Sequence, residues 1–143
     1  MERRIEEFIL EHHLLTFSSA SNGQVWCASA FYTYNSAEKQ FIITSEEKTK
    51  HIQLALPSME VAGNIALETE KIGIIRGLQF SAKLIKGGLK EKLLYLKRFP
   101  YAVLKGGDLW ILEITEAKFT DNRLGFGKKL YWRRGDETAE TSI

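Results

Sequence analysis

Extended runs of β-branched and aromatic residues recur along this chain, and helical patterns interrupt them at only a few irregular places. A parallel sheet would need strands and helices in regular alternation, and that rhythm is absent. The pattern therefore predicts a mainly β fold, in which about six antiparallel strands close into a barrel flanked by short helices. Closure removes exposed strand edges, and the rim of a barrel is a common place for a ligand.

Turn residues and period-two alternation define the expected strands. Asn22 and Gly23 predict a hairpin turn, and the run at Phe41–Ile43 is too apolar for the surface, which indicates a central strand. We expect extended segments at Leu14–Ser19, Gln24–Tyr34, Gln40–Thr44, Glu60–Glu68, Ile72–Lys86, Leu109–Phe119 and Lys128–Arg134.

The helices are expected to be short. Apolar residues at helical spacing predict an amphipathic helix over Glu2–His12, which should cover the core. Thr44 and Glu47 match a capping box, so a second helix is expected to begin there and run towards Leu56. A third helix should end before Pro100 and carry one apolar face, formed by Leu89, Leu93 and Leu96.

Length and composition limit the class of protein. The chain has 143 residues and a net charge of +2, so we expect one domain over residues 1–134 with a polar, mobile tail at 135–143. So small a charge does not indicate a nucleic-acid or membrane partner. Cys27 is the single cysteine, which excludes an internal disulfide and favours a reducing compartment. No signal peptide or membrane span is recognisable, and the cytoplasm is the expected location.

The segment Thr44–His51 places hydroxyl and ammonium groups where a strand is expected to become a helix. Lysines in a first helical turn are unfavourable unless an anion offsets the positive end of the helix. A bound phosphate would accept hydrogen bonds from backbone N–H groups and from side chains here. Its side-chain donors would be Ser45, Lys48, Thr49 and Lys50. The alternative is that Glu46 and Glu47 neutralise these lysines and that the whole segment is solvated.

Arg76 interrupts an apolar face. Strict alternation puts its side chain on the same face as Ile74, Leu78, Phe80 and Leu84. Because a buried guanidinium is costly unless paired, Arg76 should meet either a carboxylate at the core edge or a ligand phosphate. The adjacent Gly77 indicates either a bulge or the close approach of a ligand.

Two further segments could contact a ligand. Small residues in the middle of Trp26–Phe31 would let a flat ring lie against the backbone, although this segment by itself favours ordinary packing against a helix. The segment Phe119–Trp132 combines glycines with basic and aromatic residues, Lys128 among them, and predicts either a ligand loop or a tight turn. Basic and aromatic residues together could also bind single-stranded nucleic acid, which the weak net charge argues against. The histidines lack the spacing of metal ligands, so no metal site is expected.

The motifs TSEEKTKH, RGLQF, KRFP and FTDNRLGFGKK together resemble the uncharacterised YhbP-like family over nearly the whole chain. That family is similar to the pyridoxamine 5′-phosphate oxidase-like proteins. The resemblance implies a Greek-key split β-barrel that forms a homodimer, with FMN in a cleft between the subunits. The C-terminal arginine and histidine pattern that binds pyridoxal phosphate is absent, and GFGKK stands there instead. This departure argues against oxidation of pyridoxamine phosphate.

The resemblance also implies roles for individual residues. Ser29, Ala30 and Phe31 would lie beside the isoalloxazine, while Gln79 and Trp110 would contribute contacts from the partner subunit. The other residues expected to bind the cofactor are Thr44, Ser45, Lys48, Thr49, Lys50, Arg76 and Lys128.

Three functional hypotheses remain open at this point. The first is an FMN-dependent oxidoreductase that acts on an unknown small molecule, with the redox chemistry supplied by the cofactor. The second is a binding or storage module for FMN, haem or another planar ligand. The third and weakest is a single-stranded nucleic-acid binder.

Overall fold

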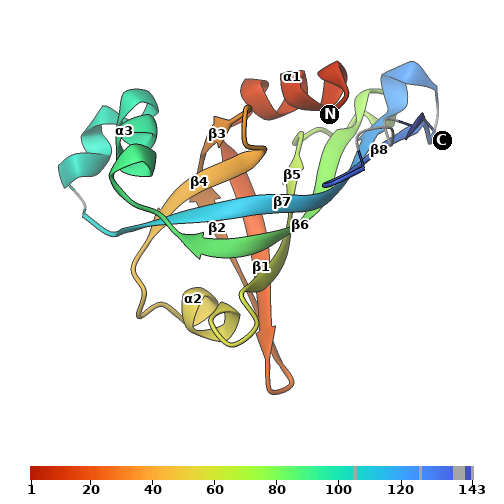
Figure 1. The fold of residues 1–143 in the computed structure, drawn as a ribbon. Helices are drawn as coiled ribbons and strands as arrows, with labels where there is room; N and C mark the ends of the chain where they lie inside the picture. The colour runs from red at the N-terminus through yellow and green to blue at the C-terminus, as the bar shows by residue number, and fades with distance from the viewer. Residues whose placement is uncertain (105, 126, 137–140, 143) are drawn as a thin grey trace.

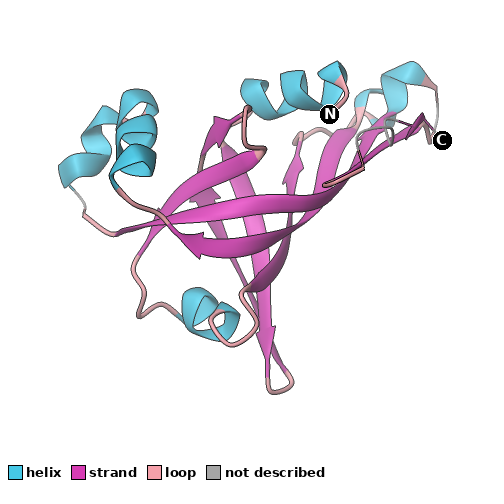
Figure 2. Ribbon diagram, in the orientation of Figure 1, coloured by secondary structure: helices cyan, strands magenta, loops and turns pink. Residues whose placement is uncertain are grey.

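A computed structural model describes residues 1–104, 106–125, 127–136 and 141–142. Its strands form one curled antiparallel sheet in the order β2-β1-β5-β6-β7-β4-β3, to which β8 and β9 are added beside β7 (Figures 1 and 2). The strands are β1 (Leu14–Ser21), β2 (Gln24–Phe31), β3 (Thr33–Asn35), β4 (Gln40–Ser45), β5 (Glu60–Ala66), β6 (Arg76–Lys86), β7 (Asp108–Asp121), β8 (Lys129–Arg133) and β9 (Thr141–Ser142). The predicted mainly β, antiparallel class is confirmed.

The described residues form nine strands where about six were expected, because one predicted run divides in two and a short strand is added within the predicted tail. The run Gln24–Tyr34 divides into β2 and β3 at Tyr32, whose backbone N–H donates to His13 rather than to the sheet. β9 adds a short pairing with β8 inside the predicted tail, while residues 137–140 and 143 of that tail lie outside the described residues. The domain boundary and the mobility of the tail stay predictions.

The predicted strand Ile72–Lys86 begins four residues too early. Ile72–Ile74 forms a 3-10 turn, η1, with exposed side chains, and β6 starts only at Arg76. Ile74 therefore does not share the face of Arg76, whereas Leu78 and the other alternate apolar residues of β6 do and are buried. Gly77 is paired without a bulge, and the register shift lies instead at Ser81 and Ala82.

Helix α1 (Arg3–Glu11) covers one open end of the curled sheet, as predicted (Figure 1). Its apolar face, with Ile5, Phe8 and Ile9, is buried against the core. The phenol of Tyr32 donates a 2.6 Å hydrogen bond to the Ile9 carbonyl and so ties the helix to the sheet.

Helix α2 (Lys50–Ala55) begins later than the sequence predicts, and the capping box at Thr44 and Glu47 is wrong. Strand β4 continues to Ser45 because Thr44 and Ser45 still pair with β7. A turn follows, in which the Thr49 backbone N–H donates to the Glu46 carbonyl, and Thr49 precedes the helix without a side-chain cap. Long-range strand pairing thus overrides a local helix signal.

Helix α3 (Leu89–Arg98) ends before Pro100, as predicted, but its apolar face is mostly turned to solvent. Leu89 and Leu93 are 72% and 61% exposed, and Tyr95 alone of this helix is buried. The Arg98 guanidinium donates to the carbonyls of His12 and Tyr32 and anchors the end of α3 beside the sheet. None of the helices in the described part of the chain combines the length and hydropathy needed to span a bilayer.

Candidate functional site

A cleft of about 430 Å³ lies between β2, the end of β4 and the segment formed by α3 and the 3-10 turn η2 (Pro100–Leu104). It is lined by Ser29, Ala30, Phe31, Thr44, Tyr95, Phe99, Tyr101 and Ala102. Four residues predicted for cofactor binding, Ser29 to Phe31 and Thr44, are therefore brought together from two strands that lie at a distance in the sequence. The volume is in the range of small-molecule sites.

Aromatic rings form the walls of this cleft. Phe99 lies 5.7 Å from Phe31 and 5.1 Å from Tyr95, measured between ring centroids. The imidazole of His13 stacks on the same Phe31 ring at 5.7 Å. Flat apolar walls of this kind suit a planar ring system. The lining residues from α3 and η2 were missing from the sequence prediction, because nothing local indicates that this helix faces β2.

A polar cluster lies directly after Thr44, at the end of β4. The Nε2 atom of His51 lies 2.7 Å from Ser45 Oγ and 3.2 Å from Thr49 Oγ1, so both hydroxyls converge on one imidazole nitrogen. Trp110 is buried and donates its indole N–H to the Ser45 carbonyl at 2.9 Å. The edge of the His51 ring meets Phe17 at 5.4 Å, and burial lowers the pKa of the imidazole.

His51 is a residue that the sequence reasoning missed. It was weighed there only as a metal ligand, and among the described residues no group of three or more ligating side chains could hold a metal ion. Its position seven residues after Thr44 gives no signal by itself. The contact arises because the turn after β4 brings α2 back over β1 and β2.

The lysines of this segment have different surroundings. Lys48 is exposed and pairs with Glu46 at 3.4 Å. Lys50 instead holds its ammonium 4.2 Å from the centroid of the Trp26 ring on β2, and no carboxylate of the described residues pairs with it. Glu47 pairs with Lys86 at 3.0 Å. The predicted neutralisation by glutamates therefore applies to Lys48 and leaves Lys50 available to an anion.

Other predicted residues lie elsewhere in this chain. Arg76 pairs across the sheet with Asp121 at one end of β6, while Lys86 at the other end pairs with Trp110. About 30 Å of strand separates these ends at the usual rise per residue. Arg76 meets the Glu11 carboxylate at 2.9 Å, which is the carboxylate alternative predicted for it. Lys128 lies at this same far end.

The remaining predictions concern the outer face and the glycine-containing turn. Gln79 is exposed on the outer face of β6, so within one chain it does not reach the cleft. The segment after Phe119 forms the end of β7, the turn η3 (Asn122–Leu124) and β8, with Asp121 accepting hydrogen bonds from Arg123. The tight-turn alternative therefore fits the described residues of this segment.

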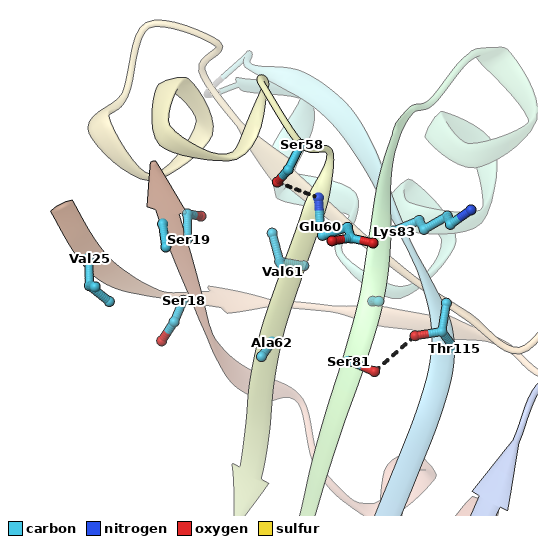
Figure 3. Close-up of a pocket in the computed structure, with 12 residues that line it drawn as sticks. Ser18, Ser19, Val25, Ser58, Glu60, Val61, Ala62, Ser81, Lys83 and Thr115 are labelled. Atoms are coloured by element: carbon cyan, nitrogen blue, oxygen red, sulfur yellow. Dashed lines mark hydrogen bonds between the residues drawn. The ribbon is translucent and has the colours of Figure 1, made fainter. Parts of the chain in front are cut away.

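A second hollow of about 570 Å³ lies where β1 and β5 diverge, and it extends over β6 (Figure 3). Small and hydroxyl-bearing side chains line most of it, and the hydroxyls of Ser81 and Thr115 lie 2.9 Å apart. Glu60 and Lys83 are the charged residues of its lining. None of the residues predicted for cofactor binding lines this hollow, and it shares no lining residue with the cleft.

Comparisons with known proteins agree with this fold. No family model matches the chain, but it is 36% identical over 140 residues to the UPF0306 protein YhbP of Escherichia coli, covering 95% of both chains. A haem binding protein from Mycobacterium smegmatis superimposes with a TM-score of 0.72 at 9% identity, over 87% of this chain and 54% of that one. A pyridoxamine 5′-phosphate oxidase-related, FMN binding protein from Nostoc punctiforme gives 0.67 at 9% identity, over 99% and 94%. These likenesses confirm the predicted split β-barrel.

Proposed function

The chain belongs to the UPF0306 family of YhbP proteins, and from this membership and the geometry of its cleft we propose that it binds FMN and passes hydride or electrons between the flavin and a small molecule. The observation that carries the proposal is that β2 and the end of β4 both contribute to two chemically different groups of residues. One group forms the cleft with aromatic walls on β2 and α3, and the other gathers hydroxyl and ammonium groups after β4. A flavin nucleotide has the same division into a flat ring and a phosphate.

The residues present fit such a ligand. Ser29 and Ala30 expose a strand with small side chains, along which a ring can approach the backbone, and Phe31 closes one end. Ser45 and Lys50 supply a hydroxyl and an unpaired ammonium for the phosphate. Bound FMN would supply the redox chemistry, while the chain orients the ring, excludes water from it and offsets the phosphate charge.

We also propose that two copies assemble and complete the cleft between them. β2 is an edge strand whose apolar residues Val25, Trp26 and Phe31 are 70%, 48% and 52% exposed, which is unusual for a surface without a partner. The exposed Gln79 on the outer face would then reach the cleft of the other subunit. Trp110, being buried in its own subunit, would act by holding the Ser45 carbonyl.

A haem storage function is the second candidate, and His13 favours it. The His13 side chain is exposed and stacks on Phe31 at the edge of the cleft. A neutral imidazole is a usual axial ligand of haem iron, and a structural neighbour from M. smegmatis binds haem.

The test is the absorption spectrum of the purified protein, followed by titration of the ligand-free chain with FMN and with haemin. The proposal expects a flavin spectrum, or saturable quenching of FMN fluorescence. Reduction of the bound flavin by NADH or NADPH with turnover would support the oxidoreductase over a binding module. A Soret band lost on His13→Ala, together with no binding of FMN, would overturn the flavin proposal in favour of haem.

A further inference from the structure

A smaller cavity of about 90 Å³ adjoins the cleft beside α3. The two cavities have Thr44, Tyr95 and Ala102 in common, so a ligand of the cleft borders the smaller cavity as well. The smaller cavity has room for several water molecules, or for one phosphate or carboxylate group. Its other described lining residues are Lys92, Leu96, Gly106, Gly107 and Leu109.

The geometry of α3 places Lys92 at this cavity. Lys92 lies three residues before Tyr95 and four before Leu96, so the three side chains share one face of the helix. Tyr95 is buried, and α3 packs against β4 and β7, so this face is turned towards the sheet (Figure 1). Lys90, two residues earlier on the helix, is also exposed but lines neither cavity.

No carboxylate of the described residues offsets the charge of Lys92. It forms no ion pair with them, and neither cavity has an aspartate or glutamate among its described lining residues. Glu91 is held at the start of α3, where it accepts the Gly88 N–H at 2.8 Å. Asp108 alternates with the lining residue Leu109 and accepts the Glu47 backbone N–H instead. An unmatched ammonium at the end of an apolar cleft favours an anionic ligand.

Neutral hydrogen-bond donors line the same cavity. The Thr44 side chain lies on the face of β4 opposite to that of Ser45, and its hydroxyl has no hydrogen-bond partner among the described residues. Gly106 and Gly107 have φ of +69° and +105°, and a Cβ added at Gly107 would lie 3.8 Å from the Cβ of Thr44. Because they lack side chains, these two residues leave their backbone open to a ligand that approaches Thr44.

Resting on the proposed binding of FMN, we propose that Lys92, Thr44 and the Gly106–Gly107 backbone bind an acidic group of the substrate, so that the molecule meeting the flavin is a phosphate or carboxylate anion. Because the cleft and the smaller cavity share part of their lining, the acidic group and the reacting part of one small molecule can occupy both. Lys50 lies against Trp26 and lines neither cavity, so it stays available for the cofactor phosphate. The two lysines thus serve different anions.

The experiment titrates the protein, with and without FMN, with inorganic phosphate and with acetate as the carboxylate, at an ionic strength held constant with chloride. The amide resonances of Gly106 and Gly107 in nuclear magnetic resonance spectra monitor the smaller cavity itself. Quenching of flavin fluorescence measures FMN binding separately. The variants are Lys92→Gln and Lys92→Arg, and Lys90→Gln is the matched control on the same helix.

We expect saturable shifts of both glycine amides with both anions in the FMN-loaded protein. Lys92→Gln should raise the dissociation constant for phosphate about tenfold or more, as for the loss of a hydrogen bond to a charged group. Lys92→Arg should keep most of the affinity because it keeps the charge, and Lys90→Gln should match wild type. FMN affinity should be the same in all of these proteins.

Shifts no larger than those with chloride alone, or an equal loss in Lys90→Gln, would overturn this inference and leave the proposed function intact. Displacement of phosphate by FMN but not by riboflavin, which lacks the phosphate, would also overturn it, because the cavity would then hold the cofactor phosphate. Failure of wild type to bind FMN would overturn the proposed function and, with it, the assignment of this cavity to a substrate.

Discussion

Lys48 and Lys50 stand two residues apart, yet their surroundings give them different capacities for binding an anion. The Lys48 side chain is 85% exposed and already paired with Glu46, so solvent and a carboxylate both screen its charge. Lys50 lies against the face of Trp26, which holds the ammonium in place without neutralising it. The residue pattern alone could place both lysines near a phosphate but could not rank them.

Lys50→Ala should therefore weaken FMN binding by about 1.5 to 3 kcal/mol, the strength of a charge-assisted hydrogen bond. Lys48→Ala should have a smaller effect, and Lys71→Ala, in an exposed segment before η1, should have none. Fluorescence titration at constant salt measures all three dissociation constants. Equal losses for Lys48→Ala and Lys50→Ala would show that the ammonium on Trp26 has no special role.

Asp121 offers a residue-scale test of stability at the opposite end of the sheet. Burial by itself would raise the pKa of this carboxyl, but side-chain and backbone hydrogen bonds from Arg123 and its charge lower the pKa below the ordinary value. A lowered folded-state pKa contributes stability above the unfolded pKa, and this is lost as pH falls through the folded pKa.

We expect Asp121→Asn to reduce the free energy of unfolding by about 1.5 to 3 kcal/mol at neutral pH, as for a hydrogen bond to a charged group. The difference from wild type should shrink in acid, where the wild-type carboxyl is also neutral. Urea unfolding at several pH values provides the measurement. Glu70→Gln, at an exposed position between β5 and η1, provides the comparison, and a difference for Asp121→Asn that does not vary with pH would contradict the argument.

At the scale of elements, sequence patterns succeed where the determinants are local. The hairpin at Asn22 and Gly23 and the amphipathic α1 follow from turn chemistry and helical periodicity, and both are present. The capping box at Thr44 fails because pairing of β4 with β7 is set by residues more than sixty positions away. The cleft is partly predictable because its walls on β2 and β4 carry a pattern that can be recognised in the sequence. Its third wall, α3, is not predictable, because it is held in place by hydrogen bonds from Arg98 to two carbonyls that are distant in the sequence.

Tyr32 links several elements. Its phenol donates a hydrogen bond to a backbone carbonyl of α1, and its own backbone carbonyl accepts a hydrogen bond from Arg98 on α3. Burial raises the pKa of its phenol, which therefore remains a donor at all physiological pH values.

Tyr32→Phe leaves the Ile9 carbonyl without its donor and should lower the free energy of unfolding by about 1 to 3 kcal/mol. Hydrogen exchange should show faster opening of α1. Tyr101→Phe, at an exposed position, should change neither quantity, and loss of protection spread evenly over the sheet would contradict the link to α1.

At the scale of the whole molecule, the far end of the sheet and the cleft carry different charge chemistry. Arg76 and Arg123 at the far end are matched by Glu11 and Asp121, whereas Lys50, which lies against Trp26 of β2, lacks a matching carboxylate in the described part of the chain. Composition gives only a net charge of +2 and cannot reveal this separation. The exposed apolar residues of β2 border the unmatched end, so a second copy placed there would cover them and enclose the site.

That assembly can be tested through Val25, which is 70% exposed on β2 and lines the hollow beside β1. Val25→Glu places a charge in the proposed interface without disturbing the core. If the partner covers this strand, an unpaired buried charge should raise the dimer dissociation constant by about a hundredfold or more. Light scattering coupled to chromatography should then report 16.3 kDa for the variant and twice that for wild type. Leu10→Glu, on the exposed side of α1, should stay dimeric.

FMN affinity should fall when the dimer dissociates, because the cleft would lose Gln79 of its partner. A monomer that binds FMN as tightly as wild type would show that one chain completes the site.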